Sequence, residues 1–375
     1  MGTRLCRIGF LAVGFLVGSS PAPAQDAPSP PSAREALERW IGLGVYLQAG
    51  YVYNLRNPSS GHNELRVFDH ASNSFSLDLA QLVCSRNAPV GGIGYKVKLS
   101  AGRTAQFIHS LGLGIEEGQD PSETEPFDLT EAFIEYAAPL GNGIAFRIGK
   151  FVTYHGTEVI EAKDTMNYSR SLLFNYAVPL THTGVMVGYR FSEQVAAQVY
   201  VVNGWDAVID NNSSKTVGAS LALAPTQRLA TTLNFMYGPE QNDNNSNNRF
   251  LFDWVATARP FDPLTLSLNA DYGFEEKAPP EGAFARWYGV SGSARYEITG
   301  WFSVSVRLEY FRDDSGSRTG QRQDLKEVTF TPELRLAQSL ILRPEYRHDW
   351  STAPVFDSGE TSHQDTIGLG ALYSW

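Results

Sequence analysis

Hydrophobic and polar residues alternate one by one along most of the chain after Leu43. In residues 93–100 every second residue is apolar, and glycine, lysine or serine lies between. The same alternation recurs in residues 182–191, 264–274 and 302–311. A period of two predicts β-strands with one apolar and one polar face. The strands run to about ten residues, the length that a tilted strand needs to cross a membrane.

The connections between these strands alternate between short and long. Short ones fall near 86–91, 138–143, 192–194, 225–228, 260–263, 298–300 and 337–339. Long polar ones fall near 55–72, 102–128, 153–181, 203–215, 239–249, 276–284, 312–324 and 351–363. A soluble sandwich also has two-faced strands, but nothing in it sorts loops by length. The pattern predicts an all-β fold, a transmembrane antiparallel up-and-down β-barrel of about 16 strands, with 14 or 18 as alternatives.

The last strand carries aromatic residues at the very end of the chain. Its apolar face consists of Ile367, Leu369, Ala371, Tyr373 and Trp375. This end resembles the signal by which outer-membrane barrels are recognised for assembly, and the residues expected to be read by the barrel assembly machinery are Gly370, Tyr373 and Trp375. An ordinary closing strand is the alternative.

The N-terminus predicts secretion. Arg4 and Arg7 precede an apolar stretch over residues 8–18, and Ala22-Pro23-Ala24 follows. This pattern is typical of a signal peptide over residues 1–24. Residues 25–42 are then a periplasmic leader, or a linker without a role, and residues 43–375 form the barrel. No segment has 18 consecutive apolar residues, so no transmembrane helix is expected.

Composition narrows the function classes. The chain has 40 acidic and 30 basic residues, and no basic cluster that would indicate nucleic-acid binding. Cys84 is the one cysteine after the signal peptide, which excludes an intrachain disulfide. Motifs of hydrolases, zinc proteases, redox proteins and nucleotide-binding loops are missing, so neither an enzyme nor a cofactor or metal site is expected.

Three segments carry a resemblance to a known family. Gly149–Glu158, Ser169–Phe174 and Pro179–Val185 resemble the motifs of the OmpL-like β-barrel porin family of the bacterial outer membrane. The specific likeness covers about residues 130–190. It implies a porin, through which small hydrophilic solutes or ions diffuse passively along a water-filled lumen. The expected surroundings are outer-membrane lipid and lipopolysaccharide, and a homotrimer is one assembly that such a porin could form.

The long connection at 153–181 is expected to fold into the lumen and narrow it. Its charged residues are the predicted pore constriction: Glu158, Glu161, Lys163, Asp164 and Arg170. Alternation places further charged residues on the lumen wall, namely Lys96, Lys98, Glu131, Glu135, Arg147, Arg190, Arg307, Arg343 and Arg347. A basic wall opposite acidic loop residues would create a transverse field across the opening. The alternatives are a solvated surface loop and simple ion pairing within the wall.

Two other functions fit parts of the pattern. An outer-membrane hydrolase of the lipase type would use Ser169 and His155 of the long loop. A structural barrel plugged by that loop would conduct nothing. For the pore, neutral residues at Glu158, Glu161 and Asp164 are expected to shift ion selectivity towards anions.

Overall fold

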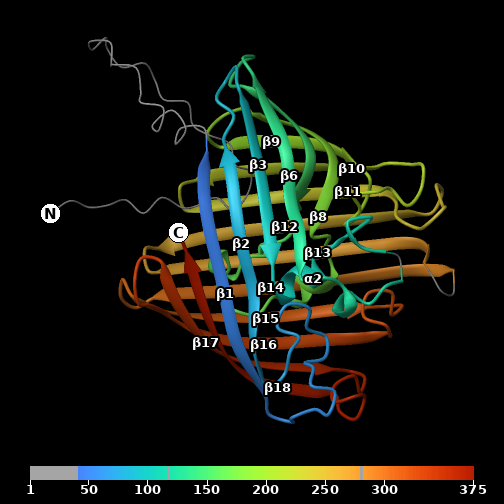
Figure 1. Ribbon diagram of the computed structural model, residues 1–375, viewed down its shortest axis with the longest axis vertical. Helices are drawn as coiled ribbons and strands as arrows, with labels where there is room; N and C mark the ends of the chain where they lie inside the picture. The colour runs from blue at the N-terminus through green and yellow to red at the C-terminus, as the bar shows by residue number, and fades with distance from the viewer. Residues whose placement is uncertain (1–40, 117, 279–281) are drawn as a thin grey trace.

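The computed structural model describes residues 41–116, 118–278 and 282–375. The signal peptide and most of the leader therefore lie outside the described residues. Sixteen antiparallel strands form one closed barrel (Figure 1), which confirms the predicted fold class and strand number. In chain order they are β1 (Gly42–Asn54), β2 (Ser74–Arg86), β3 (Ile93–Ala101), β6 (Phe127–Ala138), β7 (Ile144–Val152), β8 (Thr181–Arg190), β9 (Val195–Val202), β10 (Thr216–Thr226), β11 (Leu229–Pro239), β12 (Asn248–Phe261), β13 (Leu264–Ala278), β14 (Ala283–Glu297), β15 (Phe302–Asp313), β16 (Gln323–Arg335), β17 (Leu340–Ser351) and β18 (His363–Ser374).

The first and last strands close the barrel. β1 pairs with β2 on one side and with β18 on the other, from Tyr46–Ser374 to Asn54–Thr366. Closure leaves no strand edge, so backbone N–H and C=O groups find partners in the neighbouring strand. Inside the hydrocarbon of a bilayer, no water is present to bind an unpaired backbone group, so only a sheet without open edges is stable there.

All short turns lie at one end of the barrel and all long loops at the other. We call these the short-turn end and the long-loop end. The long loops contain α2 (Arg103–Phe107), β4 (Ser110–Leu111), β5 (Gly114–Ile115), η1 (Pro121–Glu123), η2 (Ala162–Asp164) and α3 (Leu172–Tyr176). No helix within the described residues is long and apolar enough to cross a bilayer.

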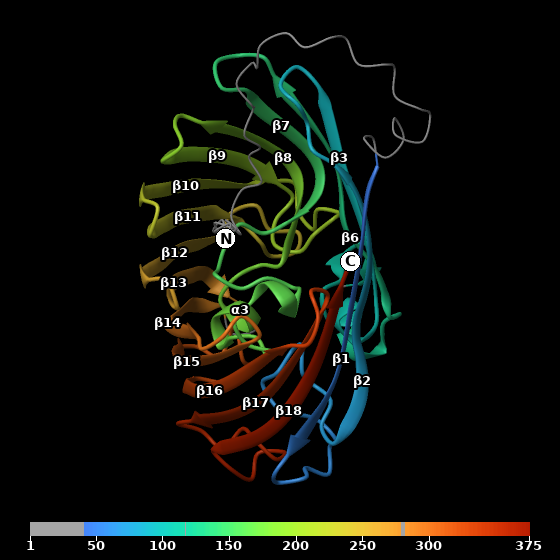
Figure 2. The same ribbon diagram turned by 90° about the vertical axis from the view of Figure 1, so that its left-hand side faces the viewer.

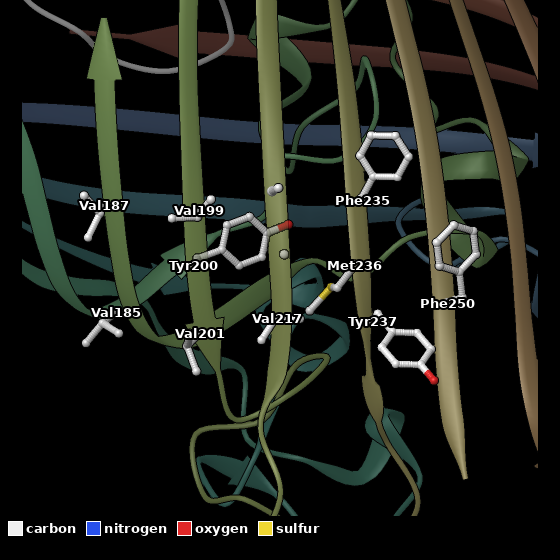
Figure 3. A pocket seen from close by; sticks show the side chains of 12 residues that line it. Val185, Val187, Val199, Tyr200, Val201, Val217, Phe235, Met236, Tyr237 and Phe250 are labelled. Atoms are coloured by element: carbon white, nitrogen blue, oxygen red, sulfur yellow. The ribbon is translucent and has the colours of Figure 1, made fainter. Parts of the chain in front are cut away.

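Most of the outer face of the barrel is apolar. Exposed large side chains on it include Leu82 and Val97 near one end and Phe235 near the other. On β8 to β12 the outer face is hollowed by a groove of about 440 Å³ (Figure 3). Valine, phenylalanine, tyrosine, methionine and small residues line this groove, and no charged residue is among them.

The pairing of β16 with β17 is interrupted at two prolines. The strands pair from Leu325–Ser351 to Phe330–Tyr346 and again at Leu334–Leu342. Pro332 and Pro344 lie opposite each other between these stretches, and neither has an N–H to donate. Proline is rare inside sheets for this reason. The inward residues beside these prolines include Arg343 and Glu345, which bind the loop described next.

Candidate functional site

The connection between β7 and β8, residues 153–180, lies inside the barrel, and we call it the lumen loop. Figure 2 shows α3 surrounded by the ring of strands. All three residues Leu172, Leu173 and Phe174 of α3 are buried. They belong to a hydrophobic cluster that joins the loop to the inner wall, with wall members Phe151, Tyr200, Val202, Met236, Leu251, Trp287, Phe311 and Leu325. The long-loop half of the lumen is therefore partly filled by protein.

Three arginines of the wall donate hydrogen bonds to backbone carbonyls of the lumen loop. Arg307 on β15 donates to the carbonyl of Ser169 at 2.9 Å. Arg343 on β17 donates to the carbonyls at positions 162, 165 and 167, at 2.5, 2.8 and 2.9 Å. Arg347 donates to the carbonyl of Arg170 at 2.6 Å. Each guanidinium has several donors in a fixed plane, so it can hold an irregular backbone that lacks its own partners.

Two wall carboxylates bind backbone N–H groups of the same loop. Glu345 accepts from the N–H groups of Tyr168 and Ser169, at 2.7 and 3.0 Å. Glu309 accepts from the N–H of Leu172, at the start of α3, at 2.6 Å. A carboxylate at this position also interacts favourably with the first turn of a helix. We call Arg307, Glu309, Arg343, Glu345 and Arg347 the seat of the lumen loop.

Tyr168 anchors the loop to β18, β1 and β2, which follow β17 of the seat around the barrel. Its hydroxyl donates to Asp78 on β2 at 2.5 Å. Its side chain lies against the inner face of β1 and β18, where a Cβ at Gly50 would come within 2.0 Å of the hydroxyl and a Cβ at Gly370 within 2.3 Å of the ring. Gly370, expected to belong to the assembly signal, thus also makes room for the loop. Tyr373 and Trp375 are 38% and 71% exposed.

The end of α3 is held by side chains from the wall and from another loop. Trp287 on β14 donates its indole N–H to the carbonyl of Ala177 at 3.1 Å. Arg318, in the loop before β16, donates to the carbonyl of Tyr176 at 2.6 Å. The Arg318 guanidinium also lies 5.1 Å from the Trp287 ring centre, a cation–π distance. These donors satisfy carbonyls that a helix end leaves free.

The five predicted constriction residues all lie on the lumen loop, but most of their charges are already neutralised. Glu158 contacts Arg307 at 2.8 Å, and Glu161 contacts Lys98 at 2.7 Å. Arg170 is 1% exposed and donates to three carbonyls of its own loop. The expected transverse field across open water is therefore replaced by direct ion pairs. Burying an isolated charge costs far more than burying a paired one, so a loop packed on the wall needs these contacts.

Lys163 and Asp164 keep contact with solvent. They pair with each other, with 30% and 35% of their side chains exposed. Both line a chamber of about 600 Å³ between the lumen loop and β1 to β3, together with Tyr46, Gln81 and Lys96. Residues from the start of β1 and the end of β18 also line it, so it opens towards the short-turn end.

Within the wall, charged residues pair across neighbouring strands. Glu135 and Arg147 are register partners and lie 2.6 Å apart. Glu131 contacts both Lys96 and Lys98, at 2.6 and 2.9 Å. On β17, Arg343 contacts Glu333 of β16 at 2.8 Å and Arg347 contacts Glu327 of β16 at 3.5 Å, while Arg347 also contacts Asp349 of its own strand at 2.8 Å. These contacts are of the kind expected from ion pairing within the wall, the alternative to a transverse field. Arg190 lies on the inner face near the short-turn end.

The Glu161–Lys98 pair predicts a pH dependence of stability. Burial would raise the pKa of Glu161, but the Lys98 ammonium and hydrogen bonds lower it from 4.5 to about 2. A carboxyl group whose pKa is lower in the folded than in the unfolded protein stabilises the folded state above pH 4.5. This stabilisation is lost as the pH falls towards 2. We therefore expect Glu161→Gln to lower the thermal unfolding temperature at pH 7 and to have a smaller effect at pH 3. An equal effect at both pH values would contradict the assignment.

The sequence did not identify how the loop is bound. Glu309 and Glu345 alternate correctly to face the lumen, and this parity was the available signal. Their partners lie 137 and 177 positions away in the chain, and no local pattern specifies such contacts. Trp287 lies on the polar face of its strand, an exception to the alternation that marks a packing contact inside the lumen.

Ser169 and His155, the residues that a hydrolase would use as nucleophile and base, do not contact each other in the described part of the chain. The Ser169 hydroxyl accepts from Arg307 and Arg347, at 3.2 and 3.4 Å. The His155 ring contacts the Thr153 hydroxyl at 3.2 Å. No hydrogen bond joins Ser169 to His155 in this part of the chain, whereas a triad needs one. Likewise, the described residues contain no group of three or more His, Cys, Asp or Glu placed to hold a metal ion.

Comparison with solved structures shows the same fold in outer-membrane proteins. The outer membrane channel DcaP of Acinetobacter baumannii is 11% identical, with 89% of this chain and 97% of that chain covered and a TM-score of 0.61. OmpF of Salmonella typhi in complex with daunomycin is 12% identical, with 89% and 97% covered and a TM-score of 0.61. An anion-selective porin from Comamonas acidovorans is 10% identical, with 89% and 99% covered and a TM-score of 0.59.

No curated protein matches the sequence. A family model does: the one described as "Putative beta-barrel porin-2, OmpL-like" matches residues 41–374. This range contains all sixteen strands and the lumen loop, and it extends well beyond the segments whose motifs carried the resemblance. The chain belongs to the OmpL-like β-barrel porin-2 family of outer-membrane porins.

Proposed function

We propose that the protein is a passive diffusion pore of the outer membrane whose lumen loop sets the size and charge of the solutes that pass. Sixteen strands make a wall too wide to be filled by its own side chains. The apolar outer face suits lipid, while the inner face carries the charged residues. Small hydrophilic solutes and ions are the class that such a lumen admits.

The observation that carries this proposal is the way the lumen loop is held. Fixed wall charges bind its backbone and leave Lys163 and Asp164 exposed to a solvent-accessible chamber. A loop held by these contacts keeps one position, so it gives the narrowed lumen a constant shape. The short-turn end would face the periplasm and the long-loop end the exterior, as in other barrels of this membrane.

Lys163 and Asp164 are therefore the charges expected to act on passing ions. Asp164→Asn should shift the reversal potential in a salt gradient towards anions, and Lys163→Gln should shift it towards cations. Charges at a constriction select ions by sign. Asp262→Asn, on an exposed short turn, is the matched control and should leave the potential unchanged. Equal potentials in wild type and both loop variants would remove this site assignment.

A plugged barrel is the second candidate, and the hydrophobic cluster inside the long-loop half favours it. Single-channel recording of the full-length protein in planar bilayers separates the two. A pore gives uniform, steady conductance steps and passes small sugars in liposome swelling. A plugged barrel gives neither.

A homotrimer remains part of the proposal. Native mass measurement in mild detergent would test it, because a trimer has three times the mass of one chain. In bilayer recording, a trimer would give three conductance steps of equal size per insertion, and a monomer single steps.

A further inference from the structure

Charged side chains gather on the outer face of the barrel at the long-loop end of β14 to β18. On β16, Lys326 is exposed, whereas its neighbours Leu325 and Glu327 point inwards and are each 1% exposed. Arg286 on β14, with 48% of its side chain exposed, flanks the fully buried Trp287 in the same way. These basic residues therefore occupy positions that elsewhere on the strands face lipid.

Aromatic residues are interleaved with the basic ones. Across the strand pairs, Arg312 lies opposite Tyr288, and Lys326 lies opposite Tyr310 on one side and Trp350 on the other. Trp350 in turn lies opposite His363. Amphipathic rings settle at the boundary between hydrocarbon and headgroups. The aromatic rings place the basic side chains at headgroup level, where a charge costs little.

The acidic residues here position the arginines but leave Lys326 unpaired. Asp314 accepts from Arg286 and Arg312, at 2.7 and 2.6 Å, and Asp324 accepts from Arg312 at 2.5 Å. Lys326 has no acidic partner among the described residues. Arg322, just before β16, is also exposed. We call Arg286, Arg312, Arg322 and Lys326 the basic rim.

The row of outward-facing residues that leads to Arg286 is apolar on β9 to β13. Register partners lead from Val201 to Val217, Tyr237, Phe250 and Phe274, and the next residue in the row is Arg286. Figure 3 shows the apolar part of this row, on the groove of β9 to β12. On β9 to β13 this row carries no basic residue, and the first one in it is Arg286 on β14.

We propose that the basic rim binds the phosphorylated headgroup of lipopolysaccharide, with its acyl chains on the apolar wall below. Lysine and arginine bind phosphate through charge-assisted hydrogen bonds. Clusters of such residues beside a membrane-spanning surface recognise anionic headgroups. This inference rests on the proposed orientation, in which the long-loop end faces the exterior, where lipopolysaccharide is the phosphorylated lipid of the leaflet. Apolar wall residues below the rim, such as Val290, Leu308 and Phe330, continue this surface.

The test is binding of purified lipid A to the full-length folded protein in detergent, with EDTA present to remove bridging cations. We expect Lys326→Gln to weaken binding severalfold and the Arg286→Gln/Lys326→Gln double variant to weaken it at least tenfold. Arg228→Gln is the matched control, because Arg228 is 56% exposed on a turn at the short-turn end. It should bind as wild type does. Unchanged heat-modified migration on gels shows that the variants are folded.

Two further probes decide between lipids. Lipid A without its phosphates should bind at least tenfold more weakly to wild type, and phosphatidylglycerol should not compete at equal concentration. Equal binding of the dephosphorylated lipid, loss of wild-type binding in EDTA, or competition by phosphatidylglycerol would each overturn the proposal. The Lys326 side chain makes no hydrogen bond or ion pair with another described residue, so its single variant cannot act by breaking an ion pair of the wall.

Discussion

Arg307→Ala is expected to release the lumen loop and raise single-channel conductance severalfold. The buried guanidinium binds Glu158 and Glu327, at 2.8 and 2.7 Å, and also the Ser169 carbonyl. Its removal leaves Glu158 without a counter-charge in a buried layer and leaves Glu327 with Arg347 alone, at 3.5 Å. Removing one partner of a buried ion pair costs about 3–5 kcal/mol. We expect the loop to leave the wall instead of remaining with these charges unpaired, and the lumen to widen.

Planar-bilayer recording measures this effect, and two variants control it. Arg335→Ala removes an arginine of which 48% of the side chain is exposed and which contacts Glu333 at 3.3 Å but not the loop. It should leave conductance unchanged. Arg307→Lys keeps the charge but loses the planar set of donors, so an intermediate conductance is expected. Wild-type conductance in Arg307→Ala would show that the seat does not hold the loop.

Leu221→Arg is expected to destabilise the barrel by about 2–4 kcal/mol, the cost of an arginine on the lipid face near the bilayer midplane. Leu221 lies in the middle of β10, opposite Leu233 and Ala197. Its neighbour Ala222 points to the lumen, opposite Thr232 and Ala196. Ala222→Arg should therefore have little effect, because its guanidinium reaches water.

Urea unfolding in lipid vesicles, followed by tryptophan fluorescence, gives both free energies. The two variants differ by one position in the chain and carry the same new side chain, so each is the control for the other. Similar losses for both, or a larger loss for Ala222→Arg, would contradict the assignment of faces.

The fold could be predicted from the sequence because its determinants are local. Lipid on one side and water on the other impose a period of two, and residues 93–100 or 302–311 show it without help from distant contacts. Loop lengths then fix which turns share an end. The same parity places Arg147 and Glu135 on the inner face, where they pair across neighbouring strands.

The seat could not be predicted, because each of its contacts joins distant segments. Nothing near Tyr168 indicates that Glu345 binds its N–H group, and nothing near Arg343 indicates that it binds the carbonyls of residues 162–167. The sequence pattern also gives no sign that Glu158 and Glu161 would meet their counter-charges directly. Whether a charged loop faces water or a charged wall depends on how the loop crosses the lumen.

Residues that break the alternation proved informative. Trp287, aromatic on a polar face, marks a contact with the lumen loop. Lys326 and Arg286, charged on an apolar face, mark the level at which the wall leaves the hydrocarbon. Pro332 and Pro344 interrupt a strand pair within a closed barrel, directly beside the inward residues of the seat.

Thiol labelling of Leu221→Cys and Ala222→Cys, each in a Cys84→Ser background, tests the assignment of faces most directly. The folded protein in lipid vesicles is treated with a hydrophilic maleimide that does not enter lipid. We expect Ala222→Cys to react and Leu221→Cys to remain unlabelled until the protein is unfolded. Equal reaction at both positions, or reaction at Leu221→Cys alone, would mean that water does not lie inside this wall and lipid outside it.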